Sequence, residues 1–164
     1  MKLLTRLSIP LLALALTCGS IAAQNFAPYK EVKVTQADVD KAIRQARAEK
    51  KFLMVEFGAN WCEDCLVLVK TLDEGNAKTY FRQHFVVLPV DVGFFDRNQE
   101  IAKALDVQLN AIPTAVFFAP DGSRVGATNK MELEPSRKFG APQILAFLKE
   151  VAERRVITSP AQFK

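Results

Sequence analysis

The sequence contains few of the residues that hold metal ions. Its 164 residues include three cysteines and a single histidine, His84. A closed tetrahedral zinc site takes four protein ligands, so one Cys-x-x-Cys pair would still need two more. We therefore expect no bound metal. Copper delivery through Cys62, Cys65 and His84 stays open as an alternative, because soft sulfur and imidazole ligands suit copper.

Long basic runs, internal repeats and low-complexity segments are absent as well. The formal net charge is +4, and the basic residues occur singly or in pairs such as Lys50 and Lys51. This distribution is typical of a solvated surface, and we expect no nucleic-acid partner. The chain is long enough for one domain with an ordinary core and too short for two comfortable domains.

The N-terminus carries the longest apolar run. Positive charges precede an apolar stretch at residues 7–16, and small residues follow it up to Ala23. This pattern predicts a secretory signal peptide at residues 1–23, cleaved after Ala22 or Ala23, because the stretch is short for a bilayer-spanning helix. We therefore expect a periplasmic protein of a Gram-negative bacterium. An uncleaved anchor and lipoprotein processing at Cys18 are the alternatives.

Cleavage of this signal peptide would also change the number of thiols. It removes Cys18 and leaves Cys62 and Cys65, which are three positions apart. Two cysteines at this spacing at the start of a helix lie on one face, close enough to form a disulfide. In an oxidising compartment such a pair is expected to be redox-active rather than metal-binding.

The hydrophobic pattern predicts alternating helices and strands. Residues 52–57 are continuously apolar apart from Glu56, which is typical of a strand buried on both faces. Alternation of this kind indicates an α/β sandwich with a mixed sheet. We expect helices at residues 36–50, 62–72, 77–84, 97–105 and 141–155, and strands at residues 52–57, 85–92, 114–118 and 124–128.

Several side chains have predicted local roles in this framework. Thr35 is the expected N-cap of the first helix, with Asp38 completing a capping box, and Asp96 is the expected cap of the helix at residues 97–105. We interpret the adjacent Phe94 and Phe95 as core residues, with a partner contact as the alternative. Residues 129–140 are charged and are expected to form a solvated loop.

The chemistry of a redox-active pair requires a thiolate as the attacking species. At the N-terminus of a helix, free backbone N–H groups and the helix dipole would stabilise the Cys62 thiolate. We therefore expect Cys62 to be exposed and nucleophilic. Cys65 would be more buried one turn later, where it resolves a mixed disulfide by attacking Cys62.

An apolar strand followed by Trp61-Cys62-x-x-Cys65, with Ile112-Pro113-Thr114 later before another strand, resembles the thioredoxin superfamily. The resemblance extends over residues 35–155. It implies a thioredoxin fold, in which helices flank a central mixed β-sheet and a cis-proline loop at Ile112–Pro113 faces the helix of the cysteines. Trp61, Ile112 and Pro113 would then form the substrate-binding surface, and no cofactor is needed.

The resemblance also assigns a role to Glu56. This residue lies six positions before Cys62, where thioredoxins typically carry a buried acidic residue. A carboxyl group in an apolar layer would have a raised pKa and could take the proton of Cys65 as Cys65 attacks. The alternative is an edge or bend position from which Glu56 simply reaches solvent.

The sequence departs from the usual thioredoxin pattern at the pair itself. Glu63 and Asp64 stand between the cysteines, and their charges would repel a Cys62 thiolate, which favours electron donation. Gly58 occupies a position where an aromatic residue is common, and Leu66 one where a basic residue is frequent. We therefore expect a partner surface unlike that of a general cytosolic thioredoxin.

The sequence as a whole predicts an exported thiol–disulfide oxidoreductase that reduces protein disulfides. Its partners would be protein thiols or disulfides and a membrane protein that donates electrons, and we expect a monomer. The alternatives are copper delivery and a non-catalytic thioredoxin-like binding module, whereas a peroxidase is disfavoured by the setting of Cys62. The expected divisions are a signal peptide at residues 1–23, an N-terminal segment at 24–34, a thioredoxin-like domain at 35–157 and a tail at 158–164.

Overall fold

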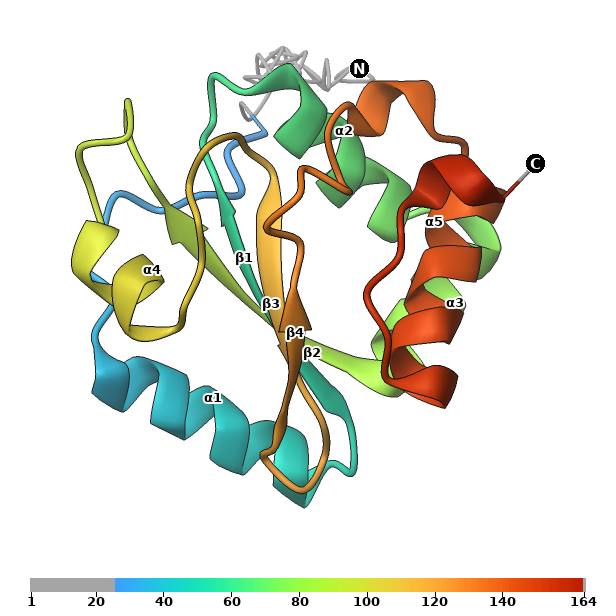
Figure 1. The fold of residues 1–164 in the computed structure, drawn as a ribbon, viewed down its shortest axis with the longest axis horizontal. Coiled ribbons are helices and arrows are strands. Elements are labelled where there is room, and N and C mark those ends of the chain that lie inside the picture. Colours follow the sequence, from blue (N-terminus) through green and yellow to red (C-terminus); the bar gives the residue numbers. More distant parts are fainter. Residues whose placement is uncertain (1–25, 164) are drawn as a thin grey trace, which may run out of the picture.

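The structure, a computed structural model, describes residues 26–163. Its centre is a four-stranded sheet with the strand order β2-β1-β3-β4 (Figure 1). β1 (Phe52–Gly58) runs parallel to β2 (Phe85–Asp91) and antiparallel to β3 (Thr114–Phe118), which in turn pairs antiparallel with β4 (Arg124–Ala127). The predicted mixed sheet is confirmed.

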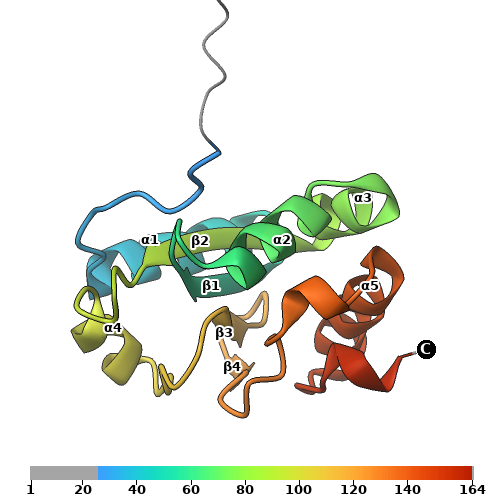
Figure 2. The ribbon, with the colours of Figure 1, turned by 90° about the horizontal axis from the view of Figure 1, so that it is seen from above.

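Helices cover both faces of this sheet. In Figure 1, α1 and α4 lie on one side of the strands, and α2, α3 and α5 lie on the other; Figure 2 shows the same layers from above. A π-helical turn extends the last helix to Arg154. The helices are α1 (Gln36–Ala48), α2 (Glu63–Leu72), α3 (Gly75–His84), α4 (Gln99–Ala104) and α5 (Ala141–Lys149), with short 3-10 turns at η1 (Ser136–Lys138) and η3 (Pro160–Gln162).

β1 is buried along its whole length because both of its faces are covered. Leu53, Val55 and Phe57 belong to the core with α1 and α4, whereas Met54 belongs to the core with α2, α3 and α5. Side chains alternate between the faces of a strand, so Glu56 lies on the same face as Met54, beneath α2. Each fully buried apolar side chain contributes about 1.5–3 kcal/mol to stability.

Capping and edge effects explain the ends of several elements. Asp38 N donates to Thr35 Oγ1 and Thr35 N donates to Asp38 Oδ2, which confirms the predicted capping box at the start of α1. Pro89 is exposed on β2, which is an edge strand of the sheet. Proline is tolerated there because its missing N–H is not needed by a further strand.

The predicted start of the fourth helix is wrong. α4 begins at Gln99, after Asn98, whose backbone is left-handed with φ of 54°. Asp96 instead closes a local turn, in which its Oδ1 accepts a hydrogen bond from Phe94 N at 3.0 Å. Asn98 accepts from Val34 N at 2.9 Å and so holds the N-terminal segment against the domain. A tertiary contact therefore sets this helix boundary.

Residues 129–140 are not merely a solvated loop. Leu133 and Ser136 are buried, and Ser136 Oγ donates a hydrogen bond to Leu133 O. Leu133 belongs to the core formed with α2, α3 and α5. The segment therefore packs as a structured lobe, and η1 within it lies beside α2.

The predicted signal peptide, including Cys18, lies outside the described residues. Within residues 26–163, no helix has both the length and the apolar character that crossing a membrane requires.

Candidate active site

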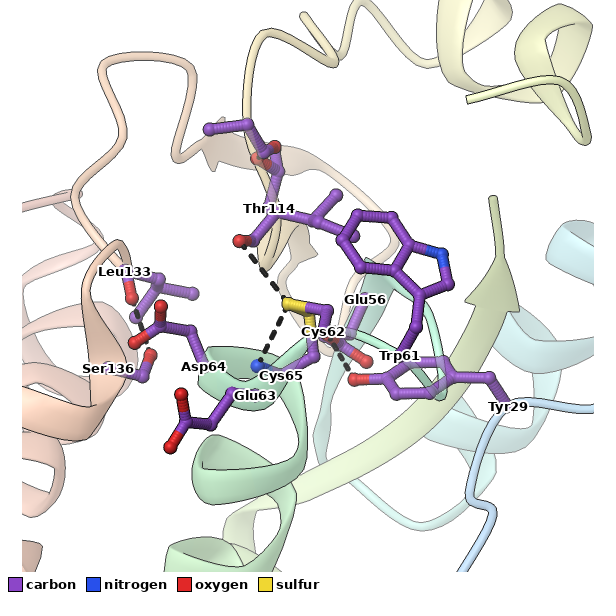
Figure 3. The surroundings of a disulfide bond; sticks show 12 residues. Tyr29, Glu56, Trp61, Cys62, Glu63, Asp64, Cys65, Thr114, Leu133 and Ser136 are labelled. Atoms are coloured by element: carbon purple, nitrogen blue, oxygen red, sulfur yellow. Dashed lines mark hydrogen bonds between the residues drawn. A yellow bond between two sulfur atoms is a disulfide. The ribbon is translucent and has the colours of Figure 1, made fainter. Parts of the chain in front are cut away.

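The cysteine pair lies at the start of α2 and forms a disulfide (Figure 3). Cys62 is the N-cap residue, and its Sγ accepts a hydrogen bond from Cys65 N at 3.2 Å. The two Cα atoms are 5.3 Å apart, as expected for a disulfide. Cys65 is completely buried, as predicted, but Cys62 is only 6% exposed, so the expectation of an exposed Cys62 is wrong for the disulfide form.

This position favours a thiolate on Cys62 when the disulfide is reduced. The N-cap sulfur already accepts from the Cys65 N–H, one of the backbone donors that a helix leaves unpaired in its first turn. The positive end of the α2 dipole points at the same atom. A thiolate is the reactive form in disulfide exchange, so the helix start favours Cys62 as the nucleophile.

The proline loop lies against the cysteines, as the resemblance implied. The Ile112–Pro113 peptide bond is cis, and Ile112 O is 3.6 Å from Cys62 Sγ. Thr114 Oγ1 donates to Ala111 O at 2.7 Å and ties together the two ends of the loop. Ile112 and Pro113 are themselves buried, and their backbone lies directly beside the Cys62 sulfur.

Trp61 forms an exposed aromatic cluster beside the pair. Its indole ring is stacked on Phe94, with centroids 5.4 Å apart, and meets the edge of Phe95. Trp61 Nε1 donates to Gly93 O at 2.8 Å and fixes the ring. Phe94 is 78% exposed and Phe95 is 39% exposed, so the interpretation of these residues as core side chains is wrong. They extend the apolar surface around the cysteines.

Glu56 is buried, with 2% of its surface exposed. Desolvation raises the pKa of its carboxyl group to about 8, and a hydrogen bond from Tyr29 opposes part of this rise. The Tyr29 hydroxyl donates to Glu56 Oε1 at 2.7 Å (Figure 3). The predicted burial and raised pKa are confirmed, and the alternative of a solvent-exposed position is wrong. Proton transfer by Glu56 remains a prediction.

The arrangement of α2 relates Glu56 to the cysteines. Cys65, Val69 and Leu72 follow one another at helical spacing and share a face of α2. Val69, Leu72 and Glu56 line a common groove of about 640 Å³ that opens along the edge strand β2. Glu56 therefore lies beneath the face of α2 that carries Cys65.

Tyr29 was missed by sequence reasoning. Its N–H donates to Asn60 Oδ1 and its carbonyl accepts from Asn60 Nδ2, so the N-terminal segment is bound to the loop before the cysteines. A Cβ atom on Gly58 would lie 2.4 Å from the Tyr29 ring. The sequence did contain one signal of this contact, which is that Gly58 stands where an aromatic residue is common. Tyr29, from a distant part of the chain, supplies an aromatic ring at that place.

Arg137 was also missed, although it contacts both carboxylates between the cysteines. Arg137 Nη1 lies 3.0 Å from Glu63 Oε2 and 3.3 Å from Asp64 Oδ2, and Arg137 N donates to Asp64 Oδ1 at 2.9 Å. Asp64 is 8% exposed. Two carboxylates and one guanidinium leave a single net negative charge beside Cys62. No local pattern in residues 129–140 indicated this contact.

His84 does not come near the cysteine pair. β1 and β2 run in parallel with Phe52 opposite Phe85. His84, the residue before Phe85, therefore lies at the end of the sheet where both strands begin. Cys62 follows the other end of β1, which is about 20 Å away for a strand of seven residues. The His84 ring packs on Tyr80 instead. Among residues 26–163, no group of three or more His, Cys, Asp or Glu side chains is placed to hold a metal ion.

The fold and the site together define a class. A mixed sheet that carries a Cys-x-x-Cys pair at a helix start, with a cis-proline loop against it, is the arrangement of thioredoxin-fold proteins. A family model described as thioredoxin-like matches residues 34–120. The chain belongs to this thioredoxin-like family.

Known proteins resemble the chain to different extents. A disulphide isomerase from Xylella fastidiosa Temecula1 is 34% identical with a TM-score of 0.70, over 76% of this chain and 95% of that one. A chloroplastic thioredoxin-like protein of rice, CITRX, is 29% identical over 58% of this chain. A protein disulfide-isomerase of Schizosaccharomyces pombe is 32% identical over 57% of this chain. The matches span 46% of the rice protein and 25% of the yeast protein.

The fold, the family and the cysteine pair together support thiol–disulfide oxidoreductase activity.

Proposed function

We propose that the protein is an exported thiol–disulfide oxidoreductase that reduces disulfides in protein substrates. The observation that carries this proposal is the Cys62–Cys65 disulfide at the start of α2, with Ile112 O 3.6 Å from Cys62 Sγ. A reactive sulfur with the carbonyl of a neighbouring backbone segment beside it suits an extended polypeptide as substrate. Trp61 and its aromatic neighbours supply apolar contact area at the rim.

The reaction has two exchange steps. In the reduced protein, the Cys62 thiolate attacks a substrate disulfide, forms a mixed disulfide and releases one substrate thiolate, which takes a proton from water. In those molecules in which the Glu56 carboxyl group is ionised, Cys65 then gives its proton to this carboxylate and attacks Cys62 Sγ. The Cys62–Cys65 bond forms, the bond to the substrate breaks, and the second substrate thiolate is protonated. The protein loses two electrons and the substrate gains them.

Charge at the helix start favours the reducing direction. Glu63 and Asp64 outnumber Arg137, so the first turn of α2, which directly follows Cys62, carries a net negative charge. Destabilising the thiolate weakens the reduced form and makes the pair a better electron donor. A reductant in an oxidising compartment needs a source of electrons, for which a membrane electron donor is the suited partner.

Insulin reduction tests the activity. With dithiothreitol as the electron source, the wild-type protein should accelerate insulin precipitation, and Cys62→Ser should abolish the acceleration. Cys65→Ser should instead accumulate mixed disulfides, which identify substrates by mass spectrometry. A folded wild-type protein without turnover contradicts the oxidoreductase proposal.

Equilibration with glutathione tests the direction of electron flow, and a potential near −120 mV, typical of strong oxidants, would contradict the reductant role.

Disulfide isomerisation is a second candidate, favoured by the similarity to the Xylella disulphide isomerase. An isomerase also attacks with a reduced Cys62, but it releases its substrate with a rearranged disulfide rather than a reduced one. Recovery of activity by scrambled ribonuclease in the presence of the reduced protein would distinguish the two, because a reductase alone leaves free thiols.

A further inference from the structure

We propose that Tyr29 is a positioning residue for the redox reaction, which holds the Glu56 carboxyl group in place to receive the Cys65 proton. The inference rests on the proposed oxidoreductase function and deepens it. Tyr29 lies in the N-terminal segment, ahead of the region in which sequence reasoning placed the site.

The contact between Tyr29 and Glu56 is short and enclosed. The Tyr29 hydroxyl lies 2.7 Å from Glu56 Oε1, and the two residues are 1% and 2% exposed. A buried carboxylate needs hydrogen-bond donors, because it has lost those of water. Among residues 26–163, Tyr29 is the side chain that hydrogen-bonds to Glu56. The Tyr29 hydroxyl thus replaces one of the hydrogen bonds that water would donate, and it does so from a fixed position.

The position of Tyr29 relative to the cysteines is fixed by hydrogen bonds. Asn60, one residue before Trp61, binds the Tyr29 backbone in both directions, at 3.1 Å through its Oδ1 and 2.7 Å through its Nδ2. Gly58 leaves the space that the ring fills, since a Cβ atom there would lie 2.4 Å from the ring. The N-terminal segment and the loop before Cys62 are therefore built around this ring.

The phenol serves as a donor and does not exchange its own proton. Burial, the charge of Glu56 and their hydrogen bond all raise the pKa of Tyr29, so its hydroxyl stays protonated. The proton that leaves Cys65 therefore ends on Glu56. The other charged residues that line the groove with Glu56 are Glu49, Lys51, Asp73 and Arg82.

Tyr29→Phe removes the hydroxyl and keeps the ring, and Tyr80→Phe on α3 is the matched control. Single-turnover oxidation of the reduced protein by insulin is followed over pH through Trp61, the only tryptophan. Loss of the hydrogen bond raises the Glu56 pKa, so the Tyr29→Phe profile should move up by about one pH unit, with a roughly tenfold slower rate at pH 7. Tyr80→Phe should follow the wild type.

Two further measurements separate this inference from the proposed function. In a Glu56→Gln background, Tyr29→Phe should cause no additional shift of the profile. Carboxyl ¹³C NMR of the oxidised protein should show a higher Glu56 pKa in Tyr29→Phe, whether or not insulin is reduced. Turnover by a folded Tyr29→Phe protein with an unshifted profile and unshifted titration overturns the role of Tyr29. A wild type without turnover overturns the proposed function, while the NMR titration still decides the Tyr29–Glu56 coupling.

Discussion

Glu56 is an ionisable group within a strand that is otherwise apolar. An unfolded glutamate titrates near 4.5, whereas burial raises the pKa of Glu56 to about 8 in the folded protein. Between these values the folded state keeps a proton that the unfolded state has released. The free energy of unfolding therefore falls as the pH rises through this window.

Glu56→Gln should remove this pH dependence. For the oxidised wild type, in which the cysteines do not titrate, we expect the free energy of unfolding to fall between pH 5 and pH 8, by on the order of 3–5 kcal/mol. The glutamine variant should be nearly flat over the same range. Guanidinium denaturation at several pH values measures both.

Glu100→Gln on the exposed surface of α4 is the control and should keep the wild-type slope. The exposed carboxyl groups of Asp38, Asp73 and Asp121 have lowered pKa values because of their hydrogen bonds, so they change stability at lower pH. A wild-type protein whose stability does not fall between pH 5 and pH 8 would show that Glu56 is not buried with a raised pKa.

At the scale of elements, the start of α2 depends on a distant segment. Glu63 and Asp64 are favourable in the first turn because they face the positive end of the helix dipole. Both also contact Arg137, which precedes α5 in the chain and is held there by the lobe of residues 129–140. The net charge at the start of α2 thus depends on side chains from two elements, α2 and η1.

Arg137→Gln should make the cysteine pair more reducing. Removing the guanidinium leaves two uncompensated carboxylates beside the Cys62 thiolate and destabilises the reduced form. Because Arg137 is about half exposed and screened by solvent, we expect the potential to fall by only about 10–20 mV. Equilibration with glutathione or dithiothreitol measures the change.

Arg82→Gln is the matched control, because Arg82 pairs with Asp73 at the opposite end of α2, at 2.9 Å. Its potential should equal that of the wild type. An equal shift in both variants would indicate a general effect of net charge, and a rise in Arg137→Gln would contradict the electrostatic argument.

At the scale of the whole molecule, removal of the predicted signal peptide would decide which thiols are present. We expect the full-length chain, expressed in a Gram-negative host, to reach the periplasm and to lose residues 1–22 or 1–23. Osmotic-shock fractionation and intact-mass measurement check this, and the mature mass should correspond to a chain with only two cysteines. Cytoplasmic retention at full length would contradict it, and a lipidated Cys18 would indicate the lipoprotein alternative. A chain lacking residues 1–23 is the control and should stay in the cytoplasm.

The predicted strands at residues 52–57 and 114–118 and the capping box of α1 follow from local patterns, so sequence sufficed for them. The Cys62–Cys65 pair and its helix start are equally local. The cis-proline loop was predicted from family resemblance. The early start assigned to α4 was wrong, because a contact with Val34 rather than a local cap decides it. The exposed positions of Phe94 and Phe95 also depend on a tertiary contact, their packing on Trp61.

By itself, the sequence determined the element order and the redox pair, and the family resemblance added the expectation of a buried acid at Glu56. Periodicity, spacing and helix-end electrostatics act over a few residues, so they can be recognised in the sequence. Only the tertiary structure decided what surrounds these groups. Tyr29 reaches Glu56 across 27 residues, and Arg137 reaches Asp64 across 73. Contacts at such separations depend on how the sheet and helices pack, which no local pattern encodes.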